Sequence, residues 1–305
     1  MPVVSIVLAT FRREALLCQT LGDLLALRGS QHEIIVVDQT PQHTVETQTY
    51  LDEIKDRILY MHLEMPGLVA ALNQGIRICR GQILLFVDDD IRVPDPGFVL
   101  DHARNYDDPT IGGVAGRVID AKAPQVGVFD PRSADPLWGF FHTSWDHETR
   151  CEVTTAPGTN MSFRREVIER VGGFDENLIG NAFRFENDLC LMVRKLGYRV
   201  VFDPQPTVYH YYRSAGGHEN RHLLGREPAS HAWYHDFFHN QVYVTLKHMP
   251  RRVLPVLLWR LYRGHVMNRP YAHEGIHFLL ARHQAFVTGI GAGFRTFWRG
   301  TFKGR

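Results

Sequence analysis

The stretch Ile83-Leu84-Leu85-Phe86-Val87-Asp88-Asp89-Asp90 places three carboxylates directly after five apolar residues. An apolar run of this kind, bounded by Gly81 and Pro94, is typical of a strand that is buried on both faces of a parallel sheet. Open α/β sheets bind their ligands at the carboxyl ends of the strands. Three adjacent acids repel one another there unless a divalent cation or hydrogen-bond donors neutralise them. The stretch therefore predicts a ligand or metal site, and the plainer alternative is a solvated acidic turn.

Strands and helices alternate around that stretch. The apolar run from Val3 to Leu8 precedes leucines that recur every three or four residues between Leu16 and Leu27, and a further run at 33–37 ends on Asp38. This alternation indicates βαβ units with right-handed crossovers. The chain has neither a Gly-x-Gly-x-x-Gly nor a Walker sequence, which removes the main support for a dinucleotide-binding or P-loop protein. An α/β fold with a mainly parallel sheet flanked by helices is therefore expected.

The charge divides the chain into an acidic body and a basic tail. With 305 residues, 44% of them hydrophobic, the chain is long enough to bury a large core, and one α/β domain of about 200 to 250 residues is ordinary. Residues 251–305 hold ten Lys or Arg and one acid, a net +9, so that residues 1–250 carry −8 of the overall +1. We therefore expect one domain followed by a basic, aromatic-rich appendage.

Two absences bear on where the chain works. No apolar run reaches the roughly 18 to 20 residues that a membrane-spanning helix needs, and the first residues lack the pattern of a signal peptide. The four cysteines show no metal-ligand spacing and are expected to be reduced: Cys18, Cys79, Cys151 and Cys190. These features predict a cytoplasmic protein, with a peripheral position at the inner face of the membrane as a further option.

Two segments of the tail, residues 253–263 and 286–298, mix Leu, Phe and Trp with Arg. Interfacial amphipathic helices have this composition, and each basic residue near an anionic surface adds about 1 kcal/mol of binding. Contact of residues 251–305 with an anionic membrane is one interpretation, and helices that pack on the first domain or on a second subunit are the other. Nucleic acid is not an expected partner, because no nucleic-acid-binding motif accompanies the charge.

Three histidines, His231, His235 and His239, recur every fourth residue and would stack on one face of a helix. Pairs with this spacing can bind zinc. No Glu stands between them in the position that zinc proteases use, and the aromatic neighbours, Trp233 among them, favour a binding-site or interface helix. Zinc is therefore not expected.

Five motifs, taken in order, resemble those of family 2 glycosyltransferases with the GT-A fold. They are residues 4–13 (VSIVLATFRR), 34–38 (IIVVD), 67–76 (GLVAALNQGI), the triplet Asp88 to Asp90, and 172–176 (GGFDE). The resemblance covers about residues 3–215. It implies a Rossmann-like mixed, mainly parallel sheet in a catalytic domain at 1–215. The nucleotide-sugar half would be about 1–115 and the acceptor half about 116–215, followed by a helical, basic and aromatic region at 216–305.

The resemblance implies transfer of a sugar, with inversion, from a UDP-, dTDP- or GDP-linked donor to a hydroxyl of a saccharide or lipid-linked acceptor. The cation would be Mn²⁺ or Mg²⁺, held by Asp90 with Asp88 and His210, and would stabilise the charge that develops on the departing diphosphate. Asp38 would accept a hydrogen bond from the nucleobase. The residues that the resemblance places around the nucleotide sugar are Thr10, Phe11, Arg13, Asp38, Gly67, Asn73, Asp88 and Asp89.

A direct displacement needs a carboxylate within hydrogen-bond reach of the acceptor hydroxyl. The resemblance places Glu186 at the position of the family's aspartate base and leaves Asp188, two residues later, as the alternative. Both acids fall in the first turn of a helix predicted from residue 185, where negative charge also suits the helix dipole. On the acceptor side the resemblance adds Asn160, and the aromatic pattern adds Trp233.

Two other classes of protein explain part of the pattern. A catalytically silent protein of the same fold that binds sugar nucleotides or polysaccharides would not need Asp88, Asp90 and Glu186 intact. A metal-dependent nucleotidyltransferase would have a glycine-rich, lysine-containing phosphate loop near the first strand, and residues 10–13 contain no glycine. A glycosyltransferase is therefore the favoured interpretation.

Overall fold

The computed structural model describes residues 3–29, 31–121, 129–137, 139, 144–211, 231–267 and 276–303. These residues form two compact units, one within Met1–Asp175 and Phe185–Leu223, the other within Glu176–Arg184 and Leu224–Arg305. The short segment 176–184 thus belongs to the second unit, although residues of the first unit surround it in sequence. The domain boundary predicted at residue 215 lies outside the described residues.

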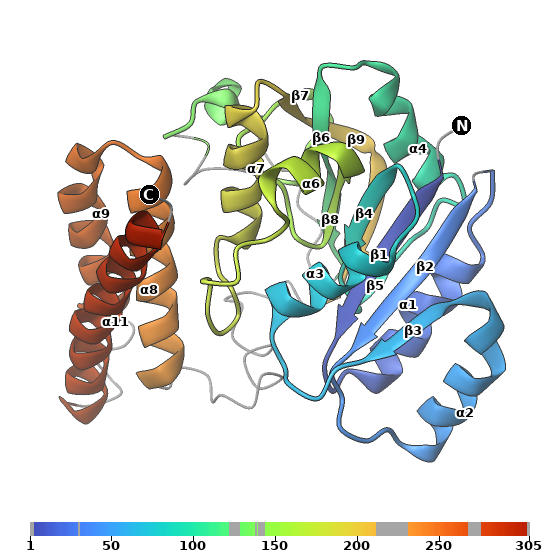
Figure 1. Ribbon diagram of the computed structural model, residues 1–305, viewed down its shortest axis with the longest axis horizontal. Helices are drawn as coiled ribbons and strands as arrows, with labels where there is room; N and C mark the ends of the chain where they lie inside the picture. Colours follow the sequence, from blue (N-terminus) through green and yellow to red (C-terminus); the bar gives the residue numbers. More distant parts are fainter. Residues whose placement is uncertain are drawn as a thin grey trace. The chain divides into compact units, whose positions relative to one another are not determined.

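A mixed sheet organises the first unit (Figure 1). Its strands lie in the order β3-β2-β1-β4-β8-β6-β9-β5, and β7 pairs with β9. Strands β1 to β4 pair in parallel, as do β6 and β9, whereas β8 pairs antiparallel with both β4 and β6, so the predicted mixed, mainly parallel sheet is confirmed. The strands span Val4–Thr10 (β1), His32–Asp38 (β2), Leu59–His62 (β3), Ile83–Val87 (β4), Ile91–Arg92 (β5), Ile111–Asp120 (β6), Cys151–Glu152 (β7), Asn160–Arg164 (β8) and Arg199–His210 (β9).

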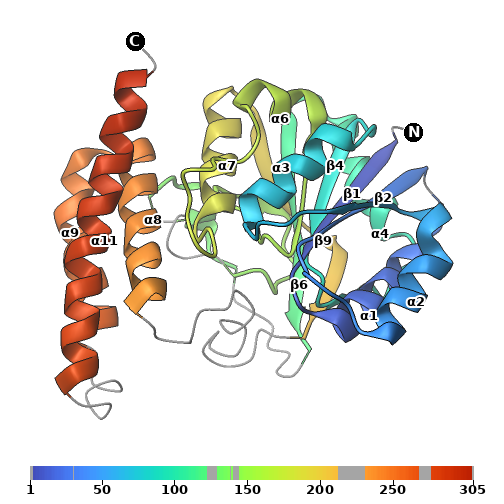
Figure 2. The same cartoon turned by 60° about the horizontal axis from the view of Figure 1, so that its bottom comes forward.

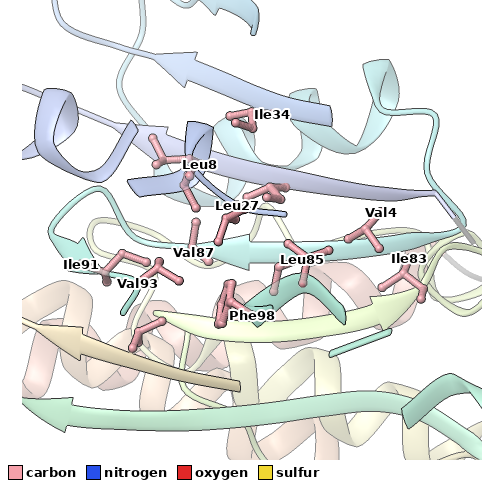
Figure 3. Close-up of a cluster of buried hydrophobic side chains, with 14 of the residues drawn as sticks. Val4, Leu8, Leu27, Ile34, Ile83, Leu85, Val87, Ile91, Val93 and Phe98 are labelled. Carbon is pink, nitrogen blue, oxygen red and sulfur yellow. The ribbon is translucent and has the colours of Figure 1, made fainter. Parts of the chain in front are cut away.

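Helices cover both faces of this sheet, because its central strands are apolar on both sides. The helices of the unit span Glu14–Leu25 (α1), Val45–Ile54 (α2), Leu68–Ile78 (α3), Phe98–Arg104 (α4), Arg165–Val171 (α6) and Phe185–Lys195 (α7), and short 3₁₀ turns span Lys55–Arg57, Asn105–Asp107 and Pro131–Ala134. On one face Leu8, Leu85 and Phe98 belong to the cluster that α1 and α4 close (Figure 3). On the other face Gly75 of α3 lies so close to Val7 that a Cβ would not fit. The two packed layers fix the carboxyl edge of the sheet.

The second unit consists mainly of helices α8 (His231–His248), α9 (Leu254–Leu261) and α11 (Ile276–Lys303), which run side by side (Figure 2). A 3₁₀ turn (Arg251–Val253) precedes α9, and a π-type turn, η6 (Tyr262–Val266), follows it. Glycines let α11 approach α8 closely, since a Cβ at Gly293 would lie 2.8 Å from the backbone oxygen of His239. None of the described helices combines the length and apolar character needed to cross a bilayer.

Segment 176–184 is anchored on α8. The side-chain amide of Asn240 donates to the backbone oxygen of Ile179 at 2.9 Å and accepts from its backbone nitrogen at 3.1 Å. Further along the segment, Nε of Arg184 donates to Oε1 of Gln241 at 3.2 Å. Ala182 and Arg184 have φ angles of 52° and 82°, which residues with a Cβ seldom adopt. The contacts with α8 hold the segment in this conformation.

Candidate active site

The carboxyl ends of β4 and β9 bring Asp88, Asp90 and His210 together. Strand β4 ends at Val87, one residue before the triplet, and the antiparallel pairing of β5 with β9 sets Ile91 opposite His210. One ligand atom from each of the three side chains lies within 4.8 Å of the others, and no second group of this kind occurs among the described residues. The predicted set of side chains could therefore hold a metal ion.

Asp90 is the most enclosed of the acids, with 1% of its surface exposed. Its Oδ1 lies 3.0 Å from Nε2 of His210, and its Oδ2 accepts from Nη1 of Arg13 at 2.6 Å. Burial opposes the charge of Asp90, but the hydrogen bond and charge of His210 and the charge of Arg13 outweigh it, so the pKa of Asp90 is lowered. Burial also works against a charged His210, and its contact with Asp90 reverses that effect and raises the pKa of His210. Any proton on Nε2 must leave before His210 can ligate a cation through that atom.

Asp89 ties the triplet to the first strand. Its Oδ2 accepts from Oγ1 of Thr10 at 2.6 Å, its Oδ1 accepts from Nη1 of Arg13 at 2.9 Å, and its backbone oxygen accepts from Oγ1 of Thr20 at 2.9 Å. Burial raises the pKa of Asp89 to about 7, against the lowering effect of Arg13 and Thr10. Thr10 and Arg13, predicted to border the nucleotide, thus bind the acid triplet. This link between the two segments was missed by sequence reasoning.

Asp88 is the most accessible acid of the triplet, with 39% of its side chain exposed. Its Oδ2 accepts from Oγ1 of Thr159 at 2.7 Å and lies 4.0 Å from Nε2 of His210. Although part of this side chain is exposed, the surrounding protein displaces water from the carboxyl group, and this desolvation is the main cause that raises the pKa of Asp88; the nearby charge of Asp90 adds to it. Thr159 was also missed, and its place directly before Asn160 was the only available signal.

Asp38, at the end of β2, is completely buried, and its carboxylate has three hydrogen-bond partners. Its Oδ1 accepts from the backbone nitrogen of Thr40 at 2.7 Å, and its Oδ2 lies 2.7 Å from Nε2 of His43 and 3.0 Å from the hydroxyl of Tyr60. Burial, followed by the charge of Asp38, raises the pKa of Tyr60. His43, Tyr60 and His62 line a cavity of about 570 Å³ beside this cluster. Asp38, the predicted nucleobase contact, has no exposed surface and is not among the residues that line the cavity, whereas its partners His43 and Tyr60 are.

The loop after β1 is held against the loop after β2. The backbone nitrogen of Arg12 donates to Oγ1 of Thr40 at 2.8 Å, although Arg12 has a φ of 57°. Its guanidinium lies 5.0 Å from the ring centre of Phe11, which is partly exposed. The backbone nitrogen of Gly67 donates to Oε1 of Gln39. Phe11 and Gly67, both predicted to contact the nucleotide sugar, thus belong to loops that border the carboxyl edge.

The two candidate bases differ in burial. Both lie in the first turn of α7, and Glu186 is partly exposed whereas Asp188 is 3% exposed. The start of this helix is packed through Phe185, whose ring centre lies 5.5 Å from that of Phe174 and whose edge touches Gly158. Glu186 is therefore the less buried of the two residues, although its Oε2 is buried.

Residues 5–172, more than half of the chain, match the family model described as Glycosyl transferase family 2. The chain belongs to this family. Over 197 residues it is 27% identical to the pre-mycofactocin glycosyltransferase of Mycobacterium tuberculosis, covering 62% of this chain and 39% of that protein. Over 216 residues it is 26% identical to the glucosyl-dolichyl phosphate glucuronosyltransferase of Haloferax volcanii, covering 68% of each. The chain spans only 25% to 39% of the length of several curated relatives that it matches.

Solved structures of glycosyltransferases share the fold. A mannosyltransferase from Pyrobaculum calidifontis, solved with GDP-Man and Mn²⁺, aligns with a TM-score of 0.55 at 19% identity over 95% of this chain and 74% of its own. TarS of S. aureus, solved with UDP-GlcNAc, aligns with a TM-score of 0.64 at 16% identity over 94% of this chain and 81% of its own. The predicted family and the predicted GT-A type of fold are thereby confirmed.

Two residues of this family 2 member that were predicted to contact ligands, Asn73 and Asn160, make hydrogen bonds within the first unit, and the nucleotide-sugar role of Asn73 stays a prediction. The side-chain amide of Asn73 exchanges two hydrogen bonds of 2.9 Å with the backbone of Phe174. Asn160 is 0% exposed, donates to the backbone oxygens of Arg117 at 3.0 Å and Pro206 at 2.8 Å, and has its Oδ1 2.8 Å from Nε2 of His102. Asn160 therefore has no exposed surface with which to meet an acceptor.

The remaining predicted residues lie in the helical unit or in the core. Trp233 stacks on Phe237 within α8, with ring centres 5.2 Å apart, and its acceptor role stays a prediction. His239 lies 2.8 Å from Oδ1 of Asn240 and 2.9 Å from Oγ1 of Thr296, which gives it a packing role in its unit. The four cysteines are all free thiols, as the sequence predicted.

Proposed function

We propose that this chain moves a sugar from a nucleoside-diphosphate sugar to a hydroxyl of a saccharide or lipid-linked acceptor, with inversion and with a divalent metal. The cluster of Asp88, Asp90 and His210 at the carboxyl ends of β4 and β9 carries the proposal. Asp38 ends β2, which is joined to β4 through β1, and these three strands are parallel. The acid cluster and the cavity beside Asp38 therefore lie along the same edge of the sheet, where one nucleotide-sugar donor could contact both.

The donor set of the cluster fits a divalent cation. Two carboxylate oxygens and an imidazole nitrogen lie within 4.8 Å of one another. Oxygen ligands alone suit Mg²⁺, whereas an imidazole among them suits Mn²⁺ better, so we favour Mn²⁺. When bound, such a cation acts as a Lewis acid toward the charge that develops on the departing diphosphate. Arg13, with its hydrogen bonds to Asp89 and Asp90, keeps both carboxylates oriented before the donor arrives.

Glu186 is the general base of the proposal. Attack on the anomeric carbon requires the acceptor hydroxyl to lose its proton to a group within hydrogen-bond reach. The partial exposure of Glu186 and the 3% exposure of Asp188 support this assignment. Asp188 stays the alternative. Displacement in a single step inverts the anomeric centre and needs no covalent intermediate.

The donor and the acceptor are proposed as classes. The two structural neighbours carry GDP-Man and UDP-GlcNAc, which supports a UDP-, dTDP- or GDP-linked donor for this chain. The Haloferax volcanii relative has dolichyl phosphate in its name, which supports a lipid-linked saccharide as acceptor. The cavity beside His43 and Tyr60 would receive the nucleobase.

A donor panel tests the proposal. The chain is incubated with UDP-, dTDP- and GDP-sugars in Mn²⁺, Mg²⁺ or excess EDTA, with simple saccharides and lipid-linked sugars as acceptors. We expect release of nucleoside diphosphate with one donor class, dependence on the cation, and a product whose anomeric signal in NMR is inverted. Tight binding of a sugar nucleotide without turnover under every condition would favour the catalytically silent protein. In a parallel incubation with nucleoside triphosphates and sugar phosphates, release of inorganic pyrophosphate would favour the nucleotidyltransferase.

A further inference from the structure

Large apolar side chains lie exposed along α9 and η6. The side chains of Val256, Trp259 and Met267 are 59%, 60% and 57% exposed, whereas Leu257 and Leu261 are 3% and 6% exposed. Spacing of three and four residues along α9, widened in the π-type turn, sets the three exposed side chains on one side of the segment and the two leucines on the other. The segment is therefore apolar on its outer side as well as on the side that packs within its unit.

Arginines fill the gaps between those apolar side chains. Arg252, Arg260 and Arg263 are exposed, recur at the same helical spacing, and complete a surface that we call the α9 outer face (Arg252, Val256, Trp259, Arg260, Arg263 and Met267). The guanidinium of Arg263 lies 5.8 Å from the ring centre of Trp259. Residues 251–267 contain no Asp or Glu. The α9 outer face thus combines apolar bulk with a single sign of charge.

Helix α11 also exposes large apolar side chains. Ile276, Leu280, Val287 and Trp298 are 65%, 59%, 57% and 46% exposed and fall on one side of the helix, away from Gly293, which meets α8. Residues 276–303 contain no acid. Helices α9 and α11 of this unit therefore both expose large apolar side chains in stretches without an acid.

We propose that the helical unit binds an anionic lipid surface through the α9 outer face. Lipid headgroups offer phosphate to the arginines and an apolar layer directly beneath it to Val256, Trp259 and Met267. A nucleic acid would satisfy the arginines and leave the apolar side chains in water. An ordinary protein interface gathers its apolar side chains at the centre and its charges at the rim, whereas here the two alternate. This inference goes beyond the proposed transfer reaction and does not depend on it.

Sedimentation of the full chain with lipid vesicles tests the proposal. Wild-type protein should bind vesicles of phosphatidylcholine mixed with phosphatidylglycerol, bind vesicles of phosphatidylcholine alone far more weakly, and dissociate as salt is added. The variant Arg252→Gln/Arg260→Gln/Arg263→Gln should lose on the order of 100-fold in affinity for the mixed vesicles, since each basic residue contributes roughly fivefold. A second variant, Val256→Ser/Trp259→Ser, should also bind at least about 10-fold more weakly, because burial of its apolar side chains is lost.

A matched control removes three exposed basic residues from the first unit, Arg28→Gln/Lys55→Gln/Arg80→Gln. Its net charge equals that of the triple variant in the α9 outer face, and it should keep most of the wild-type affinity. Circular dichroism should give the same helix content for all variants. Equal affinity of the two triple variants, or no binding of wild-type protein to either vesicle, would overturn the proposal. Self-association of wild-type protein that the serine variant abolishes, without vesicle binding, would assign the face to a second copy of the chain instead.

Discussion

Acid should destabilise the first unit through one buried imidazole. His102 of α4 is 0% exposed, with Nε2 2.8 Å from Oδ1 of Asn160 and Nδ1 2.9 Å from Oγ of Ser162. Because the amide nitrogen of Asn160 already donates to two backbone oxygens, its Oδ1 faces His102 and must accept from Nε2. Burial disfavours the imidazolium and lowers the pKa of His102 from 6.5 to about 4, despite the raising effect of that hydrogen bond.

The sign and size of the effect follow from the two pKa values. Between pH 6.5 and about 4 the unfolded chain binds a proton at this residue and the folded chain does not. The free energy of unfolding therefore includes no penalty from His102 above pH 6.5, and it decreases as the pH falls from 6.5 to about 4. At about 1.4 kcal/mol for each pKa unit, the full loss is about 3 kcal/mol, of which about 2 kcal/mol is reached by a pH of about 5.

Urea unfolding of wild-type protein and of His102→Gln at a pH of about 7 and about 5 measures this loss. Gln can donate to Asn160 but does not titrate, so the variant should start less stable and lose about 2 kcal/mol less than the wild type on acidification. All other titrating groups act on both proteins and cancel in the difference. An equal loss of stability by the two proteins would refute the assignment of the acid sensitivity to His102.

Three further predictions concern the reaction. Asp90→Asn should abolish transfer because one hard ligand is lost, and it should lower the unfolding midpoint because Arg13 and His210 lose a buried charged partner; full activity of this variant, or of wild-type protein in excess EDTA, would exclude the metal role. Glu186→Gln should lower kcat by about 10² to 10⁴ with donor Kd unchanged, and if Asp188→Asn has that effect instead, the role of base passes to Asp188. His43→Ala should weaken binding of the nucleoside diphosphate by roughly 10-fold in calorimetry while kcat at saturating donor stays near wild type, because the buried Asp38 loses one of its partners.

The sheet and the acid triplet are predictable because their signals are local. An apolar run that ends in three acids occupies eight consecutive positions, and burial of β4 on both faces follows from its composition alone. The partners of those acids are different, since Arg13 reaches Asp89 across 76 positions and Tyr60 reaches Asp38 across 22. No spacing rule states which polar side chain will be nearest after folding.

The role of Asn160 could not be predicted from the sequence for a similar reason. A family motif places an asparagine beside the site, but whether its amide meets a ligand or the backbone depends on strands β6 and β9, which lie far away in sequence. In the structure Gly116 of β6 leaves no room for a Cβ next to Asn160, and Pro206 accepts one of its hydrogen bonds. The side-chain amide of Asn160 therefore makes its hydrogen bonds inside the core, and only the tertiary structure shows this.

The anchoring of segment 176–184 on α8 matters for anyone who recombines members of this family. The chain joins the second unit after Asp175 and returns to the first at Phe185, one residue before Glu186. A chimera that exchanges only the C-terminal helices would pair a foreign α8 with a resident segment whose left-handed Ala182 and Arg184 depend on Asn240 and Gln241. The exchangeable module is therefore discontinuous in the gene, and a crossover placed after β9 alone would separate the two halves of one folded part.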